Sequence, residues 1–387
     1  MLRCRLIGFF REKYLMTEKF DLNKFLAKAI SIGTSDVHLI VDEHPIIRKD
    51  GKIIKIDMPK ITEDDINTAI NILIPKNAKT SAMSKFDLDF AYEIKGVSRF
   101  RVNLSHQLGK IALVIRNIPY SIKSLEDLNL PKTIEQFAQL NNGLVLVTGP
   151  TGSGKSTTLA SLIDYVNINY PKHIITIEDP IEFIFVGKKS IISQRQIEID
   201  TPSFPDGVKY ALRQDPDVIL IGEIRDRETV ESALKASETG HLVFATLHTN
   251  GAVQTMNRII NMFEPQDRQY IREQLASTLR GIISQKLVNN KSGLGRRPAC
   301  EVLVATPTIR DFIIKDEFDQ IYNLVKKGSF NEMITMNMSL FDLFNDSLIT
   351  EEEALDKTDN KNELQQMFKG VFHGADRVDL QKGQKDE

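Results

Sequence analysis

The residues best suited to chemistry lie in the glycine-rich stretch GPTGSGKST, at positions 149–157. Gly149, Gly154, Lys155 and Ser156 satisfy the spacing G-x-x-x-x-G-K-[ST] of a phosphate-binding loop. The glycines let successive backbone N–H groups curve around a phosphate, and the start of the following helix adds partial positive charge. Lys155 is suited to the β- and γ-phosphates and Ser156 to Mg²⁺.

An ordinary glycine-rich turn is the alternative interpretation of this stretch. However, an apolar strand is expected before it at 144–148, and a helix with Leu159, Leu162, Ile163 and Val166 on one face is expected after it. Strand, loop and helix in this order are the context that the motif requires. We therefore predict that a nucleoside triphosphate binds to Gly149, Pro150, Thr151, Gly152, Ser153, Gly154, Lys155, Ser156 and Thr157.

Two acidic clusters end apolar strands after this loop. HIITIEDPIEF contains Glu178 and Glu182, and VILIGEIRD contains Glu223, with Gly222 where a magnesium-binding strand usually carries Asp. Ligands of parallel sheets bind outside the carboxyl ends of the strands, so both clusters are expected to face the nucleotide. We predict that Glu223 supports Mg²⁺, directly or through water, and that Glu178 positions and deprotonates the attacking water. The alternative is that Glu178 and Glu182 are solvated loop charges.

The stretch TGHLVFATLHTN contains His241 and His248. They are seven residues apart, so on a regular strand they point to opposite faces, and a shared metal is not expected. Thr246 and His248 share one face near the carboxyl end of the strand, where a polar residue could contact the γ-phosphate. The alternative is that His248 is a structural histidine.

Phosphoryl transfer also needs positive charge on the γ-phosphate. The first part of the chain offers Arg99, Arg101 and Arg116 on two adjacent expected strands. Taken alone, these arginines are better interpreted as surface charges.

The elements before residue 119 predict a small α+β domain over 17–118. Apolar residues at 22, 25, 26, 29 and 30 indicate one helix face, and Thr62 is suited to cap a second helix, with Asp65 in its first turn. Short apolar runs around Asp50–Gly51 indicate a hairpin, and the alternation of Phe100, Val102 and Leu104 with polar residues indicates a strand. Prolines bracket an expected linker over 119–131.

The pattern changes after residue 131, because helices alternate with fully apolar strands at 144–148, 174–177, 218–221 and 242–247. Such strands predict a doubly wound α/β domain with a parallel sheet over 132–345. We expect a helical tail over 346–370 and a disordered C-terminus over 371–387. Residues 1–16 are expected to be a disordered leader, with a weak membrane-surface helix or a true start at Met16 as alternatives.

Composition narrows the function classes. The 387 residues are enough for two domains, and a net charge of −2 predicts no broad attraction to nucleic acid. No apolar run approaches the roughly 20 residues that span a bilayer. Cys4 and Cys300 are the only cysteines and are far apart, which argues against a disulfide framework or structural zinc and fits a reducing cytosol.

Together these segments resemble the type IV pilus retraction ATPases, the PilT/PilU group of the secretion-type hexameric ATPases. The resemblance extends over residues 17–370 and is carried by SDVHL, RFRVN, GPTGSGKSTTLA, ITIEDPIEF, RQDPDVILIGEIRDRET and TGHLVFATLHTN. It implies a PAS-like first domain joined to a RecA-like ATPase domain. It also implies a homohexameric ring with nucleotide at the domain and subunit junctions.

The resemblance also implies roles for individual residues in the hydrolysis of ATP with Mg²⁺. Glu178 would be the catalytic glutamate of an Asp box, and Glu223 would support magnesium in a Walker B segment that lacks its first Asp. The remaining residues that the resemblance implicates are His241 and His248 of the His box, and Arg101 and Arg116, which the first domain extends toward the nucleotide.

Three functions stay open at this point. Extension and type II secretion ATPases carry a further N-terminal domain and a four-cysteine zinc site that are not recognisable here, which favours a retraction motor. GRRPACEVLVATP is more similar to PilU, and TIRDFIIKDE at 308–317 approximates the PilT retraction motif with Ile314 in place of arginine. An accessory ATPase acting with a paralogous retraction motor is therefore the second candidate. A nucleic-acid translocase is the third, disfavoured by the near-neutral charge.

For a retraction motor, the resemblance implies an inner-membrane platform protein as partner and no nucleic acid. It also implies a cytoplasmic location, peripheral to the inner membrane at the pilus base.

Overall fold

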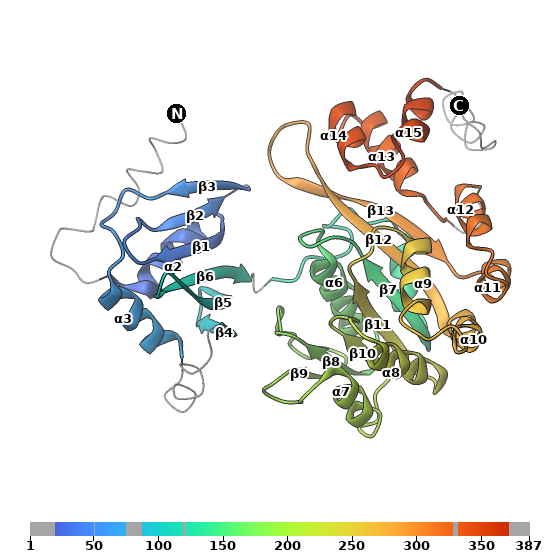
Figure 1. Cartoon of the computed structure of the whole chain (residues 1–387), viewed down its shortest axis with the longest axis horizontal. Helices are drawn as coiled ribbons and strands as arrows, with labels where there is room; N and C mark the ends of the chain where they lie inside the picture. Colours follow the sequence, from blue (N-terminus) through green and yellow to red (C-terminus); the bar gives the residue numbers. More distant parts are fainter. Residues whose placement is uncertain (1–19, 50, 75–86, 119–120, 328–331, 371–387) are drawn as a thin grey trace. The chain divides into compact units, whose positions relative to one another are not determined.

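The computed structural model describes residues 20–49, 51–74, 87–118, 121–327 and 332–370. The described residues form two compact units, the first comprising those up to Ser121 together with Glu182–Ile184, and the second comprising the other described residues (Figure 1). The expectations for 1–16 and 371–387 concern residues outside the described ranges. Within 119–131, the carbonyl of Lys123 accepts a hydrogen bond of 2.7 Å from the Ser161 hydroxyl, so part of the expected linker packs on the second unit.

The first unit is a six-stranded antiparallel sheet with helices, as the α+β prediction required. Its strand order is β3-β2-β1-β6-β5-β4. Its helices are α2 (Leu22–Ser31) and α3 (Glu63–Leu73), and its strands are β1 (Thr34–Ile40), β2 (Ile46–Lys49), β3 (Lys52–Lys55), β4 (Leu88–Ile94), β5 (Ser98–Gln107) and β6 (Lys110–Ile118).

Local sequence explains these elements. Leu22, Phe25, Leu26 and Ala29 of α2 are buried in the core of the first unit, which confirms the predicted helix face. Thr62 caps α3, and Asp65 accepts from the Thr62 backbone N–H in return, a reciprocal capping box. On β5 the residues Phe100, Val102 and Leu104 are buried as predicted, which leaves the arginines between them on the opposite face.

A seven-stranded sheet of order β13-β12-β7-β11-β10-β8-β9 forms the centre of the second unit. All neighbouring pairs from β12 to β9 are parallel, and β13 pairs antiparallel with β12, so the predicted parallel sheet is confirmed. The strands are β7 (Gly143–Thr148), β8 (His173–Glu178), β9 (Ile191–Gln196), β10 (Val218–Ile221), β11 (Leu242–Leu247), β12 (Leu279–Asn289) and β13 (Arg296–Val304).

Both faces of this sheet are covered by helices. Leu144 and Leu146 of β7 belong to one core with residues of α7 to α10, while Val145 and Val147 between them are equally buried on the other face. The helices are α5 (Thr133–Ala138), α6 (Lys155–Asn169), α7 (Phe204–Ala211), α8 (Arg227–Glu238), α9 (Ala252–Ile260), α10 (Arg268–Thr278), α11 (Pro307–Ile314) and α12 (Phe318–Lys326). Continuous apolar strands are the consequence of this two-sided burial.

Three C-terminal helices, α13 (Met336–Asn345), α14 (Glu351–Lys357) and α15 (Lys361–Phe368), form a small group of their own (Figure 1). Their separate core includes Leu340, Ile349 and Leu364, and it also takes in Val288 and Ala299 from the ends of β12 and β13. Among the described residues, none of the helices combines the length and apolarity needed to cross a membrane.

Candidate nucleotide site

The predicted phosphate loop connects β7 to α6 and has the backbone that only glycine adopts easily. Gly149, Gly152 and Gly154 have φ angles of +145°, +79° and +92°. A Cβ atom at Gly149 would lie 2.2 Å from the carbonyl oxygen of Gln285, and one at Gly154 would lie 2.8 Å from the Nε2 of Gln285. Two of the motif's glycines are therefore also required because the loop packs directly on β12.

Lys155 is the first residue of α6 and is held over this loop. Its Nζ donates to the carbonyl oxygens of Gly149 and Pro150 at 2.8 and 3.2 Å, and the side chain is largely buried. Ser156, next along the first turn of α6, is exposed. An ammonium group and a hydroxyl at the mouth of a glycine loop are suited to phosphate oxygens and to a magnesium ion respectively.

Glu178 is the last residue of β8, at the same sheet edge as the loop. Its Oε1 accepts from the Thr176 hydroxyl at 2.6 Å and from the Gln194 amide at 3.3 Å. These neutral donors hold the carboxylate in one place, which a residue that positions an attacking water requires.

Gly222 explains why the usual aspartate is missing. Its N–H donates to the carbonyl oxygen of Ile177 at 2.8 Å, which draws the end of β10 against the end of β8. A Cβ atom at Gly222 would lie 3.2 Å from the Cα of Glu178. There is therefore little room for a side chain at position 222, and Glu178 at the end of β8 is the adjacent acid.

Glu223 and His248 meet in the structure, although they follow different strands. Nε2 of His248 lies 3.1 Å from Oε1 of Glu223, and Nη2 of Arg225 lies 2.7 Å from Oε2. The hydrogen bond that Arg225 donates to Glu223 raises the pKa of the Arg225 guanidinium. Thr246, expected to face the same region, is buried and donates instead to the carbonyl oxygen of Gly222 at 2.6 Å.

His241 lies at the opposite end of the same strand. It precedes β11, and its Nδ1 is 2.9 Å from the carbonyl oxygen of Ala236 and 3.1 Å from the Thr239 hydroxyl. β11 therefore separates His241 from His248, and the structure does not bring His241 to the phosphate loop of its own chain.

Arg101 and Arg116 face each other as direct partners on β5 and β6 of the first unit. Arg116 Nε donates at 2.8 Å to Oδ1 of Asp36, a buried carboxylate on β1. Arg48 of β2 approaches the other oxygen of Asp36 at 4.0 Å. Arg101 lies 3.6 Å from Asp89. The result is a charged row across five neighbouring strands, from β2 to β4.

Several buried polar residues contact the phosphate loop or the strand before it and could not be predicted from motif spacing. On β12, Gln285 contacts the loop, and the Ser284 hydroxyl lies 2.8 Å from that of Thr148, the residue before the loop. The available signal was the pair Ser284–Gln285 inside the apolar run IISQKLV, because buried polar residues in a strand need partners.

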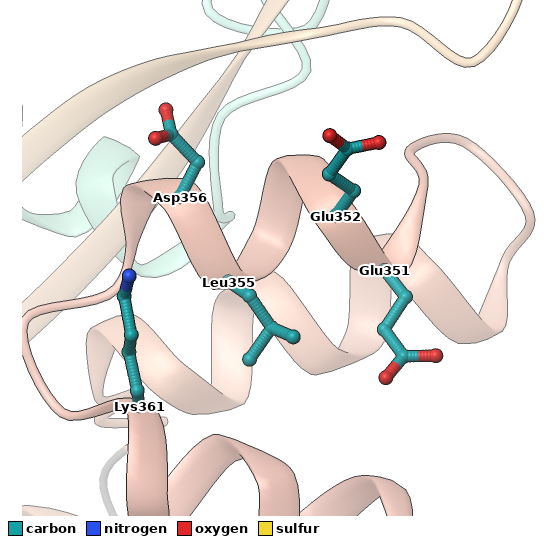
Figure 2. A pocket seen from close by; sticks show the side chains of 5 residues that line it. All are labelled: Glu351, Glu352, Leu355, Asp356 and Lys361. Atoms are coloured by element: carbon teal, nitrogen blue, oxygen red, sulfur yellow. The ribbon is translucent and has the colours of Figure 1, made fainter.

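A surface hollow of about 560 Å³ lies among the C-terminal helices, away from these residues. Figure 2 shows its lining on α14 and at the start of α15, with the carboxylates of Glu352 and Asp356 on one side of the helix and Glu351 on the other. Leu355 and Lys361 complete the lining. None of the predicted site residues belongs to it.

Comparison with known proteins agrees with this geometry. A family model described as type II/IV secretion system protein matches residues 15–338. The chain is 40% identical over 337 residues to the type IV pilus retraction ATPase PilT of Pseudomonas aeruginosa, which covers 87% of this chain and 98% of that protein. It is 36% identical over 359 residues to the type IV pilus ATPase PilU of the same organism, covering 92% and 94% of the two chains.

A solved structure of the pilus retraction motor PilT with bound ADP is 42% identical, with a TM-score of 0.82, over 90% of this chain and all of that one. This similarity extends across both units, and the phosphate loop supplies the site that an ATPase needs. The chain therefore belongs to the type II/IV secretion system protein family and is an ATPase of its PilT/PilU group.

Proposed function

We propose that this chain is a homohexameric motor that hydrolyses ATP and uses the energy to withdraw pilin subunits from a type IV pilus. The observation that carries the proposal is the alignment of three features along the carboxyl edge of one parallel sheet. These are the phosphate loop after β7, Glu178 at the end of β8 and Glu223 just beyond β10. The names of the similar PilT and PilU proteins support the link to pili.

In this proposal the phosphate loop holds ATP through residues 149–157. Ser156 and Glu223 hold Mg²⁺, Glu223 directly or through water, and the ion would neutralise charge on the phosphates. Glu178 accepts a proton from the attacking water, and His248 steadies Glu223. Arg101 and Arg116 supply positive charge at the domain and subunit junctions of the ring.

His241 has no place beside the phosphate loop of its own chain, so its proposed part in hydrolysis requires the nucleotide of a neighbouring copy. The motor would act on an inner-membrane platform protein from the cytoplasmic side of that membrane. Nucleic acid is not part of the proposal, and turnover stimulated by added DNA would contradict it.

One observation favours a second candidate, an accessory ATPase that works with a paralogous motor. Ile314 ends α11 within the segment 308–317 and is partly exposed, at the position where the retraction motif typically carries arginine. An apolar side chain there cannot make the ion pairs that an arginine could make.

Restoration of twitching tests the two candidates. The gene would be expressed in a bacterium that lacks PilT but keeps PilU, in one that lacks PilU but keeps PilT, and in one that lacks both. Twitching restored in the strain lacking both supports the autonomous motor. Restoration only where PilT is present supports the accessory role, and failure in every strain despite normal protein levels would contradict both.

A further inference from the structure

Gln285 of β12 contacts the phosphate loop and the helix that follows it with the two ends of one amide. Its Nε2 donates to the carbonyl oxygen of Ser153 at 2.8 Å, and its Oε1 accepts from the Thr158 hydroxyl at 2.7 Å. The side chain is only 3% exposed. We infer that Gln285 is a positioning residue that sets the orientation of the phosphate loop for nucleotide binding. The inference rests on the proposed ATP site.

The position of Gln285 is fixed by the sheet. β12 runs parallel to β7, with Ser284 paired to Thr148, and the hydroxyls of these two residues are 2.8 Å apart. Gln285 therefore stands one residue beyond the end of β7, at the level where the loop begins. On its other side Gln285 pairs with Cys300 of β13, so a neighbouring strand fixes its backbone.

The bond to Ser153 has a direct consequence for phosphate binding. In a trans peptide the C=O and the following N–H point in opposite directions. The Ser153 carbonyl points toward β12 because it accepts from Gln285, so the N–H of Gly154 in the same peptide points away from β12. Backbone N–H groups turned into the concave side of such a loop are the donors that bind phosphate.

The bond to Thr158 connects the same amide to α6. Thr158 lies in the first turn of α6, which begins at Lys155. Gln285 therefore fixes the loop and the start of the helix relative to each other. Glutamine suits this position because its terminal amide supplies both a donor and an acceptor at the same distance from the backbone. Methionine has similar length and supplies neither.

The hydroxyl of Ser153 has no hydrogen-bond partner among the residues that the structure describes. The Ser153 side chain therefore adds no further polar contact to hold this peptide. This leaves the amide of Gln285 as the side-chain donor on which the orientation of the peptide depends.

The decisive experiment measures nucleotide affinity in the full chain, with a fluorescent ADP analogue and Mg²⁺, beside KM and kcat for ATP. In Gln285→Met we expect the Kd for the analogue and the KM for ATP to rise about tenfold, as for one buried partner left unsatisfied. We expect kcat to change by less than about twofold, because ground state and transition state use the same loop contact. Thr158→Val, which keeps the bond to Ser153, should raise Kd less than Gln285→Met does.

Gln285→Glu gives a signature that a merely structural residue would not show. A carboxylate accepts from Thr158 but cannot donate to Ser153, whereas a protonated carboxyl can. The affinity of Gln285→Glu should therefore recover as pH falls, relative to wild type and to Gln285→Met at the same pH. This variant also keeps the inference testable if Gln285→Met does not fold.

Gln320→Met, an exposed change on α12, is the matched control and should leave Kd unchanged. A Gln285→Met protein with wild-type Kd and a lowered Tm would overturn the inference. A Gln285→Glu protein whose affinity does not respond to pH would overturn it as well. Lys155→Ala tests the proposed site separately, since nucleotide binding that survives this change would contradict the site itself and not only the role of Gln285.

Discussion

Nε2 of His248 lies 3.1 Å from Oε1 of Glu223, so the loop after β11 contacts the acid that follows β10. Glu223 is held on its other oxygen by Arg225. A carboxylate fixed on both sides has one orientation in which to face a magnesium ion. Outer partners of this kind commonly set the affinity of a metal site.

His248→Ala should weaken the response to magnesium. Because the partner of a metal-supporting carboxylate is lost, we expect the Mg²⁺ concentration for half-maximal ATP turnover to rise about 10-fold or more. The measurement is phosphate release against Mg²⁺ at saturating ATP. His173→Ala serves as the control, since His173 begins β8 at the sheet edge opposite the phosphate loop, and an equal shift in both variants would contradict a specific role for His248.

Introducing an acid at position 222 should lower the stability and the turnover of the enzyme. A Cβ atom there would lie 3.2 Å from the Cα of Glu178, so Gly222→Ala and Gly222→Asp both push the ends of β8 and β10 apart. We expect each to lower stability by about 1–3 kcal/mol, the usual cost of overpacking. Thermal unfolding and phosphate release measure the two effects.

Introducing Gly222→Asp into a Glu178→Gln protein tests whether an acid at position 222 can replace the acid at position 178. We expect no recovery of turnover, because the aspartate would displace the strand end that carries position 178. Recovery toward the wild-type rate would show that an acid at either strand can serve and would contradict this explanation of the glycine.

Asp36→Asn should lower turnover without touching the nucleotide itself. The neutral amide keeps the size of Asp36 but weakens the charge-assisted bond that holds Arg116. If Arg116 acts in hydrolysis, kcat should fall by about 10-fold, the worth of one such bond. Asp89→Asn, at the more exposed partner of Arg101, is the control and should have a smaller effect.

The Cys300 thiol should resist alkylation in the folded protein. Burial raises its pKa to about 12, so at neutral pH the reactive thiolate is essentially unpopulated and reagents cannot reach it. A Cys4→Ser protein, in which Cys300 is the remaining cysteine, should take up iodoacetamide only when denaturant is added. Rapid labelling of the native protein would contradict the burial of β13.

The sequence allowed parts of this account to be predicted because some signals are local. Loop spacing located Lys155, and runs of apolar residues located β7, β8, β10 and β11, because strands buried on both faces need no polar residues. The pairing of Glu223 with His248 was not predictable, because it depends on β10 and β11 being neighbours in the sheet.

Two further features could be explained only by the three-dimensional structure. The glycine at 222 could be noticed from the sequence, but its cause is the close approach of the β8 backbone, which no spacing reports. Gln285 lies about 130 residues from the loop that it contacts, far beyond the reach of any motif, although its polarity within an apolar strand marked it as unusual.

We propose that Glu178 supplies the acid that position 222 cannot carry. This role of Glu178 is tested most directly by Mg²⁺-dependent phosphate release from ATP in the wild type and in Glu178→Gln. ADP affinity and oligomer size are measured in each sample. We predict a loss of turnover of about 100-fold or more, as expected for removal of a general base, with affinity and oligomer unchanged. Glu178→Gln protein that turns over ATP at the wild-type rate would contradict the claim.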